Sequence, residues 1–305
     1  MKLPFQENYT AATLRGDLFG ALTSTVVALP TALAFGVASG LGAAAGLYEA
    51  IAVGFVAAVF GGTRSQISGP TAPMAVAMAV IISNHASTLP EALSVVVLAG
   101  LTQVTLGLVG IGRFVAYTPY VVVSGFMSGI GIIIILIQSL PFLGAPTASG
   151  GALGAIGALS VAMDDINSSA VAIAGVTLLV GVLWPRRLAR FLPAPLVALV
   201  SGTLLGIFWS HDVPVIGPVP TGLPEFQLEL PSAEFLMSAL QPALILALLG
   251  SVDSLLTSLV ADSLTGTRHN PNRELVGQGI GNMVSGIFGG MPGAGATLGL
   301  SLIHI

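Results

Sequence analysis

The sequence VAAVFGG at residues 56–62 recurs in altered form as VSGIFGG at residues 284–290. Each copy precedes a segment rich in proline and glycine, SGPTAP at residues 68–73 and MPGAGAT at residues 291–297. A helix-like apolar run resumes after each of these breaks. Four identities in seven small or apolar residues are weak evidence alone, since two membrane helices can resemble one another by chance. The significance of the repeat therefore depends on the topology around it.

The composition indicates a chain that lies in a lipid bilayer. Of 305 residues, 54% are hydrophobic and 7% are charged, against about 25% charged residues in a soluble domain. A mean hydropathy of +0.96 leaves a water-soluble fold without a polar surface, whereas a bilayer requires an apolar exterior. The absence of Cys excludes disulfides, thiolate metal sites and cysteine nucleophiles.

Two further classes of function are excluded by the same counts. The net charge of -4 provides no basic surface for nucleic acid. The sequence contains no recognisable nucleophile and base pair, metal cluster or nucleotide-binding loop, so we expect neither an enzyme nor a tightly bound cofactor.

Apolar stretches predict nine membrane-spanning helices and the start of a tenth. A helix needs roughly 17 to 25 residues to cross the hydrocarbon core. The strict alternation typical of a β-barrel is not seen. The predicted spans are residues 18–38, 42–62, 67–84, 92–111, 119–139, 169–185, 194–210, 236–262 and 275–289, with a tenth from about residue 295.

The basic residues support this count. If residues 1–17 are cytoplasmic, all nine Lys and Arg residues fall on the cytoplasmic side, where such residues concentrate. The opposite loops, 85–90, 140–168 and 211–235, contain no Lys or Arg. We therefore expect a multi-pass protein of the inner (plasma) membrane with a cytoplasmic N-terminus. Since the last residues stop inside a span, we also expect the chain to be truncated.

This topology gives the two copies of the repeat opposite orientations. Inverted repeats with discontinuous helices are typical of secondary transporters, whose site lies between the repeats near the midplane. A helix that begins inside the membrane leaves its first N–H groups unpaired, and two facing ends of this kind favour an anion. We place Thr71 and Ala72 at one end and Ala296 and Thr297 at the other. Tightly packed kinked helices without a ligand are the alternative.

Three acidic residues lie in or near the predicted hydrocarbon region, where a charge is costly and is read as functional by default. Asp253 lies in the middle of a span, with the Thr257 hydroxyl one turn away on the same face. A carboxylate, a hydroxyl and free carbonyls suit a hard cation such as sodium. The alternatives are a carboxylate that binds and releases a proton, or a structural hydrogen bond. Asp262 near Arg268 predicts an interfacial salt bridge, and Glu49 is interpreted as structural, facing a neighbouring subunit or the interface.

Several stretches resemble the SulP anion transporters, the sulfate permease or solute carrier 26 family. They are GDLFG at residues 16–20, VALPTALAFG at 27–36, SGFMSGIG at 124–131, VADS at 260–263 and ELVGQGIGN at 274–282. The resemblance implies an all-α polytopic membrane protein with a UraA-like fold of two inverted seven-helix repeats, divided into core and gate helices. Family members usually carry a STAS domain after these repeats and are often dimeric.

Under this resemblance, residues 18–305 form a transmembrane domain that is truncated in or after the tenth helix. The first repeat spans about residues 18–210, and about residues 236–305 form the start of the second repeat. The remaining gate helices and the STAS domain would be absent. The tail at residues 300–305 departs from the family pattern, because His304 stands where a polar neutral residue is expected.

The resemblance further implies a secondary active transporter of a small inorganic anion that works by alternating access. Asp253 with Thr257 is similar to the sodium-coupled bicarbonate symporters of the family. Carried over by position, the sodium site comprises Asp253, Thr257, Gly295, Ala296 and Thr297, and bicarbonate lies between the Thr71–Ala72 and Ala296–Thr297 ends. Proton-coupled transport of sulfate or a dicarboxylate, and an anion channel or exchanger, are the alternatives.

Overall fold

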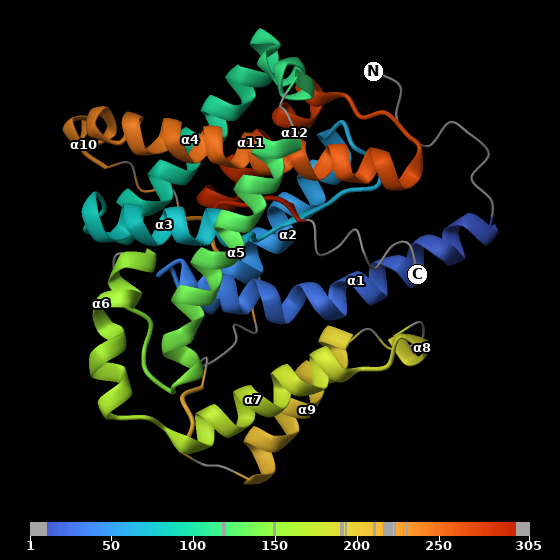
Figure 1. Ribbon diagram of the computed structural model, residues 1–305. Coiled ribbons are helices and arrows are strands. Elements are labelled where there is room, and N and C mark those ends of the chain that lie inside the picture. The colour runs from blue at the N-terminus through green and yellow to red at the C-terminus, as the bar shows by residue number, and fades with distance from the viewer. Residues whose placement is uncertain are drawn as a thin grey trace.

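The computed structural model is almost entirely helical in the part of the chain that it describes (Figure 1). This part comprises residues 11–117, 120–148, 151–189, 192, 194–209, 212–215, 222, 224–227, 229 and 231–296. The helices are α1 (Ala11–Ala38), α2 (Ala43–Phe60), α3 (Ala72–Asn84), α4 (Leu89–Val109), η2 (Ile111–Tyr117), α5 (Tyr120–Phe142), α6 (Gly151–Asp164), α7 (Ser168–Leu183), α8 (Arg186–Ala189), α9 (Ala194–Trp209), α10 (Ala233–Ser238), α11 (Leu240–Thr265) and α12 (Pro271–Ile287). Two short strands, β1 (Ile67–Gly69) and β2 (Ala294–Ala296), complete the described elements.

Each of the nine predicted spans contains a helix. Within the described ranges, four helices are long and apolar enough to cross a membrane, and they lie at Leu14–Ala38, Ala43–Phe60, Leu89–Val109 and Leu240–Thr265. The predicted tenth span starts at the edge of the described residues. One prediction was wrong: residues 140–168, interpreted as a loop, contain helix α6, which packs beside α5.

Local sequence signals explain where the helices begin and end. At the start of α4, the Thr88 hydroxyl accepts a hydrogen bond from the Glu91 N–H, and the Glu91 carboxylate accepts one from the Thr88 N–H. This reciprocal pair satisfies two backbone donors that the first helical turn leaves unpaired. The same helix ends at Gly110, whose φ of 84° is readily adopted only by glycine.

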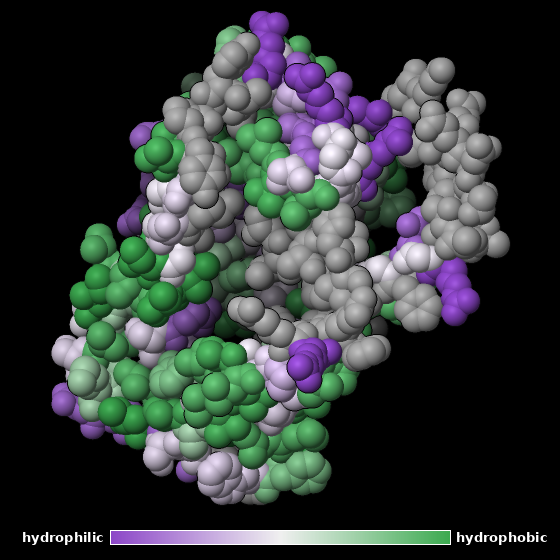
Figure 2. Space-filling view, turned by 45° about the vertical axis from the view of Figure 1, so that its right-hand side comes forward, coloured by the Kyte–Doolittle hydropathy of each residue, from purple (hydrophilic) through white to green (hydrophobic). Residues whose placement is uncertain are grey.

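The helices form two groups in space. Helices α1 to α4 pack with α11 and α12, whereas α5, α6, α7 and α9 contact mainly one another. In Figure 1, α7 and α9 lie side by side at the bottom of the view, below α1. Figure 2 shows apolar residues over much of the lower part of the molecule, and α7 and α9 expose large hydrophobic side chains that include Leu183 and Phe208. Such a surface suits contact with lipid.

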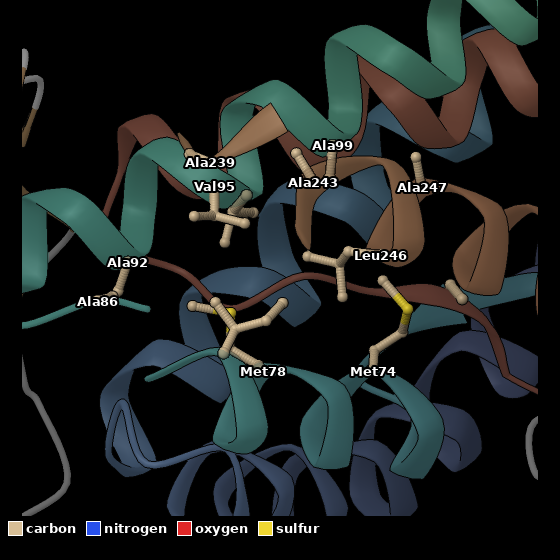
Figure 3. Packing of buried hydrophobic residues seen from close by; sticks show 13 residues of the cluster. Met74, Met78, Ala86, Ala92, Val95, Ala99, Ala239, Ala243, Leu246 and Ala247 are labelled. Carbon is tan, nitrogen blue, oxygen red and sulfur yellow. The ribbon is translucent and has the colours of Figure 1, made fainter. Parts of the chain in front are cut away.

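A cluster of apolar side chains holds the first group together where α3, α4 and α11 meet. Met74 and Met78 of α3 face Val95 of α4 and Leu246 of α11, and all four are almost completely buried (Figure 3). Alanines such as Ala99 and Ala243 complete the cluster. Small residues let helix backbones approach closely, and the flexible methionines fill the irregular space between them.

The closest approach of α4 and α12 depends on two glycines. A Cβ at Gly100 would lie 2.5 Å from the Gly279 carbonyl oxygen, and a Cβ at Gly279 would lie 2.5 Å from the Gly100 carbonyl oxygen. Real Cβ atoms do not approach backbone this closely, so any side chain at either position forces the helices apart.

We therefore expect Gly279→Ala to lower the free energy of unfolding by about 1–3 kcal/mol, the usual cost of overpacking a core. Thermal unfolding of the detergent-solubilised protein measures this loss. The matched control is Gly175→Ala in α7, where a Cβ would meet no atom within 4 Å. Equal melting temperatures for the two variants would contradict the close crossing.

Candidate anion and cation site

The two sequence breaks pair directly with each other. Strands β1 and β2 form an antiparallel ribbon in which Ile67 lies opposite Ala296 and Gly69 lies opposite Ala294. The pairing joins segments from the two copies of the repeat, more than 200 residues apart in the sequence. The structure is thus consistent with the prediction that the two breaks share one region of the fold. Each break also contains a short strand, which the sequence analysis did not predict.

The first predicted helix end lies where it was expected. Helix α3 begins at Ala72, with Thr71 as its N-terminal cap residue, and the Thr71 side chain makes no capping hydrogen bond to the helix. The Ala72 and Met74 N–H groups belong to the first turn, so the helix provides them no backbone partner, and Pro73 has no N–H. The start of α3 therefore carries the positive partial charge that attracts an anion.

The second end is only partly described. Ala296 is the last residue of β2 rather than the first residue of a helix, and its side chain is half-buried. Thr297 and the segment 300–305 with His304 lie outside the described residues. The predicted anion position between two helix ends therefore has one described end, at Thr71 and Ala72.

A cavity of about 310 Å³ opens beside the start of α3, between the two groups of helices. It is large enough for a small inorganic anion. Most of its lining is apolar, which strengthens the field of the few polar groups near it. The lining residues are Ala72, Pro73, Val76 and Ala77 of α3, Gly125, Gly129, Ile133 and Ile134 of α5, and Leu249 of α11.

Asp253 is connected to the start of α3. The carboxylate, on α11, is buried with 4% of the residue exposed, and its Oδ2 accepts a hydrogen bond of 2.8 Å from the Thr71 hydroxyl. The cap residue of α3 is therefore also a direct partner of the buried acid. This contact links the candidate cation ligand to the candidate anion end through one side chain.

Two of the other predicted sodium ligands, Thr257 and Gly295, contact each other beside α11. The Thr257 hydroxyl donates a 3.0 Å hydrogen bond to the carbonyl oxygen of Gly295, and the Gly295 N–H donates to the Ser254 hydroxyl at 3.1 Å. Strand β2 is thus fastened along the face of α11 that carries Asp253. The carboxylate, two hydroxyls and a carbonyl are the hard oxygen ligands that an alkali cation prefers.

A fourth carboxylate, which the sequence analysis did not select, organises the loop between α2 and β1. Glu274 of α12 is 2% exposed. Its Oε2 accepts hydrogen bonds from the N–H groups of Gly62 (2.8 Å) and Thr63 (2.9 Å). Its Oε1 accepts from the Gln66 side chain (3.0 Å) and the Gln278 side chain (2.9 Å). Glu274 therefore fixes the approach to β1 by three bonds, and its fourth bond is to Gln278 on its own helix.

Further polar residues of α12 extend this network at helical spacing. Gln278 donates to the Ser68 hydroxyl of β1 at 2.5 Å. The Asn282 side chain accepts from the Gly293 N–H at 2.8 Å and donates to the Gly293 carbonyl at 3.1 Å. One face of α12 thus holds β1 and the segment that leads into β2. The stretch 274–282 had been quoted only for its family resemblance, and its polar four-residue period was the available signal.

The two remaining acids differ from their predicted roles. Glu49 does not face a neighbouring subunit or the membrane interface, since it is completely buried against Gly293. Asp262 pairs with His269 rather than Arg268, with 2.7 Å between Asp262 Oδ2 and His269 Nδ1. The sharp turn after α11 brings His269 back toward this helix end, and sequence proximity to an arginine did not decide the pairing.

Comparisons with known proteins agree on the kind of molecule this is. The sequence profile of the sulfate permease family matches residues 14–303. The bicarbonate transporter BicA of Synechocystis sp. is 49% identical over 295 residues, covering 94% of this chain and 52% of that protein. The chain therefore spans about half the length of this curated relative.

Solved structures give the same result. The transmembrane domain of a cyanobacterium bicarbonate transporter BicA superposes with a TM-score of 0.88 at 48% identity, covering 97% of this chain and 78% of that one. The overall structure of SLC26A9 gives a TM-score of 0.82 at 18% identity, covering 99% of this chain and 53% of that one. The second match shows a shared fold alone.

Proposed function

The chain belongs to the sulfate permease family, and from this premise we propose that it forms part of a secondary active transporter that carries bicarbonate together with sodium by alternating access. The observation that supports this most is the contact between Thr71 and Asp253. It places a helix end suited to an anion one hydrogen bond away from a buried carboxylate suited to a cation. A symporter needs such proximity, because each ion then makes binding of the other more favourable.

We assign the roles of the site residues as follows. The start of α3 at Thr71 and Ala72, with Ala296 and Thr297 of the second break, binds the anion through backbone N–H groups. Asp253, Thr257 and Gly295, with Ala296 and Thr297, bind sodium through oxygen atoms. Sodium neutralises Asp253, so the negative charge of that carboxylate no longer opposes the anion beside it.

The choice of bicarbonate rests on the similarity to proteins named as bicarbonate transporters. The family name points to sulfate as the competing substrate. We further propose that the protein lies in the plasma membrane with its N-terminus in the cytoplasm and acts as a homodimer. The concentration of Lys and Arg on one side of the predicted topology supports this orientation.

Uptake of radiolabelled bicarbonate into proteoliposomes tests the proposal. An inward sodium gradient should drive accumulation, while an equal potassium gradient should not. Excess unlabelled sulfate serves as a competitor. Uptake that ignores the sodium gradient would contradict sodium coupling, and uptake of labelled sulfate in place of bicarbonate would contradict the substrate. Currents far above the turnover of a carrier in voltage-clamp recording would indicate a channel instead.

A further inference from the structure

Glu49 is a buried acid that the proposed transport site does not use. It lies in the middle of α2 and is completely inaccessible to solvent. Neither of its carboxyl oxygens has a hydrogen-bond partner among the described residues. An unpaired carboxylate is among the most costly groups to bury, particularly in a bilayer. Its presence therefore requires a ligand or a change of protonation.

The surroundings of Glu49 are formed by the segment that leads into β2. The Glu49 carboxyl group lies directly against Gly293, where a Cβ would collide with Oε1. The carbonyl oxygen of Gly69 in β1 lies near the same point, 3.0 Å from where the Gly293 Cβ would be. The Glu49 carboxyl group thus packs against the segment that precedes β2, on the side of the ribbon that faces α2.

The nearby backbone groups are already engaged. The Ala45 carbonyl accepts from the Met291 N–H, and the Met291 carbonyl accepts from the Ser285 hydroxyl. The N–H and carbonyl of Gly293 are both taken by the Asn282 side chain. Among these described backbone groups, no N–H donor is left to stabilise a charged carboxylate at Glu49.

Charged side chains of the described neighbouring elements do not pair with Glu49 in place of these backbone groups. Two titratable residues of α12, Arg273 and Glu274, form hydrogen bonds near the C-terminal end of α2, around Phe60 and Gly62. This end of α2 is far from Glu49. The α12 side chains near Gly293 are the neutral Asn282 and Ser285. The described part of α1 meets α2 through Ala32 and small residues, and the ribbon offers only backbone. A proton differs from a metal ion in requiring a single acceptor.

We propose that Glu49 is a proton-binding site, a second cation position that lies behind the ribbon and is separate from the candidate sodium site at Asp253. The segment that covers Glu49 continues into β2, which contacts Thr257 and Ser254 on its other side. Release of the proton leaves a charge that must gain solvent, so this segment has to move away from α2. The protonation of Glu49 is therefore tied to the position of β2.

Infrared spectroscopy of the purified protein tests the proposal without any transport substrate, so its outcome is independent of the proposed function. At neutral pH we expect a carbonyl stretching band of a protonated carboxylic acid. Labelling with ¹³C-glutamate should shift this band, which distinguishes a glutamate from the buried Asp253 without mutation. Glu49→Gln should remove the band, and Glu91→Gln, at an exposed capping position, should leave it intact. A spectrum without a glutamate-derived acid band would overturn the proposal.

A second measurement follows the functional consequence, which rests on the proposed function. Sodium-driven anion uptake by the wild type should fall at the same alkaline pH at which the infrared band disappears. Uptake by Glu49→Gln, which stays neutral, should not change over that range. A pH profile identical in the two proteins would overturn the link to β2. Absence of uptake in both at every pH would contradict the proposed function and leave the infrared result standing.

Discussion

Replacing Asp253 with asparagine should abolish sodium-driven uptake. The substitution keeps the shape of the side chain and removes the negative charge that attracts the cation. Loss of an outer partner of a metal ligand typically weakens metal binding by about 10–100-fold, so loss of a charged ligand itself should exceed about 100-fold. The initial rate of uptake as a function of external sodium concentration measures this change.

The control for this variant is Asp262→Asn, on the same helix but bound to His269 at the C-terminal end of α11. It should retain the sodium dependence of the wild type. Thr71→Val, which removes the hydroxyl bonded to Asp253, should give an intermediate loss. If Asp253→Asn transports with unchanged sodium dependence, Asp253 is a structural residue and the sodium site lies elsewhere.

Replacing Glu274 with alanine should cause the largest loss of stability. The change removes one acceptor from four donors, namely the part-buried N–H groups of Gly62 and Thr63, the part-buried side chain of Gln66 and the buried side chain of Gln278. A buried donor left without its acceptor costs about 1–3 kcal/mol, so the four losses together should lower the free energy of unfolding by more than about 3 kcal/mol. Thermal unfolding monitored by size-exclusion chromatography measures the effect.

Glu274→Gln separates charge from shape in this network. Its amide can accept fewer of the four bonds and brings its own donor among donors, so its stability should lie between those of the wild type and Glu274→Ala. Glu91→Ala removes one half of the capping box at the start of α4 and leaves the Thr88 cap in place, so it should cost only about 0.3–1 kcal/mol. A Glu274→Ala protein as stable as Glu91→Ala would show that the network does not hold the loop.

Much of this fold could be predicted from the sequence, because a membrane span is encoded locally. Length and hydropathy identify each span from a single stretch, and the family resemblance is confirmed by the match over residues 14–303. Helix α6 was missed because its alanines and glycines are shared by loops and helices in such a chain. At 14 residues it is also shorter than a typical span.

The candidate site was predictable only where its residues are neighbours along a helix. Asp253 and Thr257 were paired from their four-residue spacing, and Thr71 and Ala72 from the break before α3. The contact between Thr71 and Asp253 joins positions 182 residues apart, and no local pattern encodes it. The same holds for Glu274, whose partners lie more than 200 residues away for all but Gln278.

The pairing of β1 with β2 also bears on stoichiometry. Backbone hydrogen bonds join the segment before α3 to the segment that contacts α11, so a displacement of one would carry the other with it. Under the proposed function, the anion and the cation would consequently cross together, which favours a fixed ratio between them.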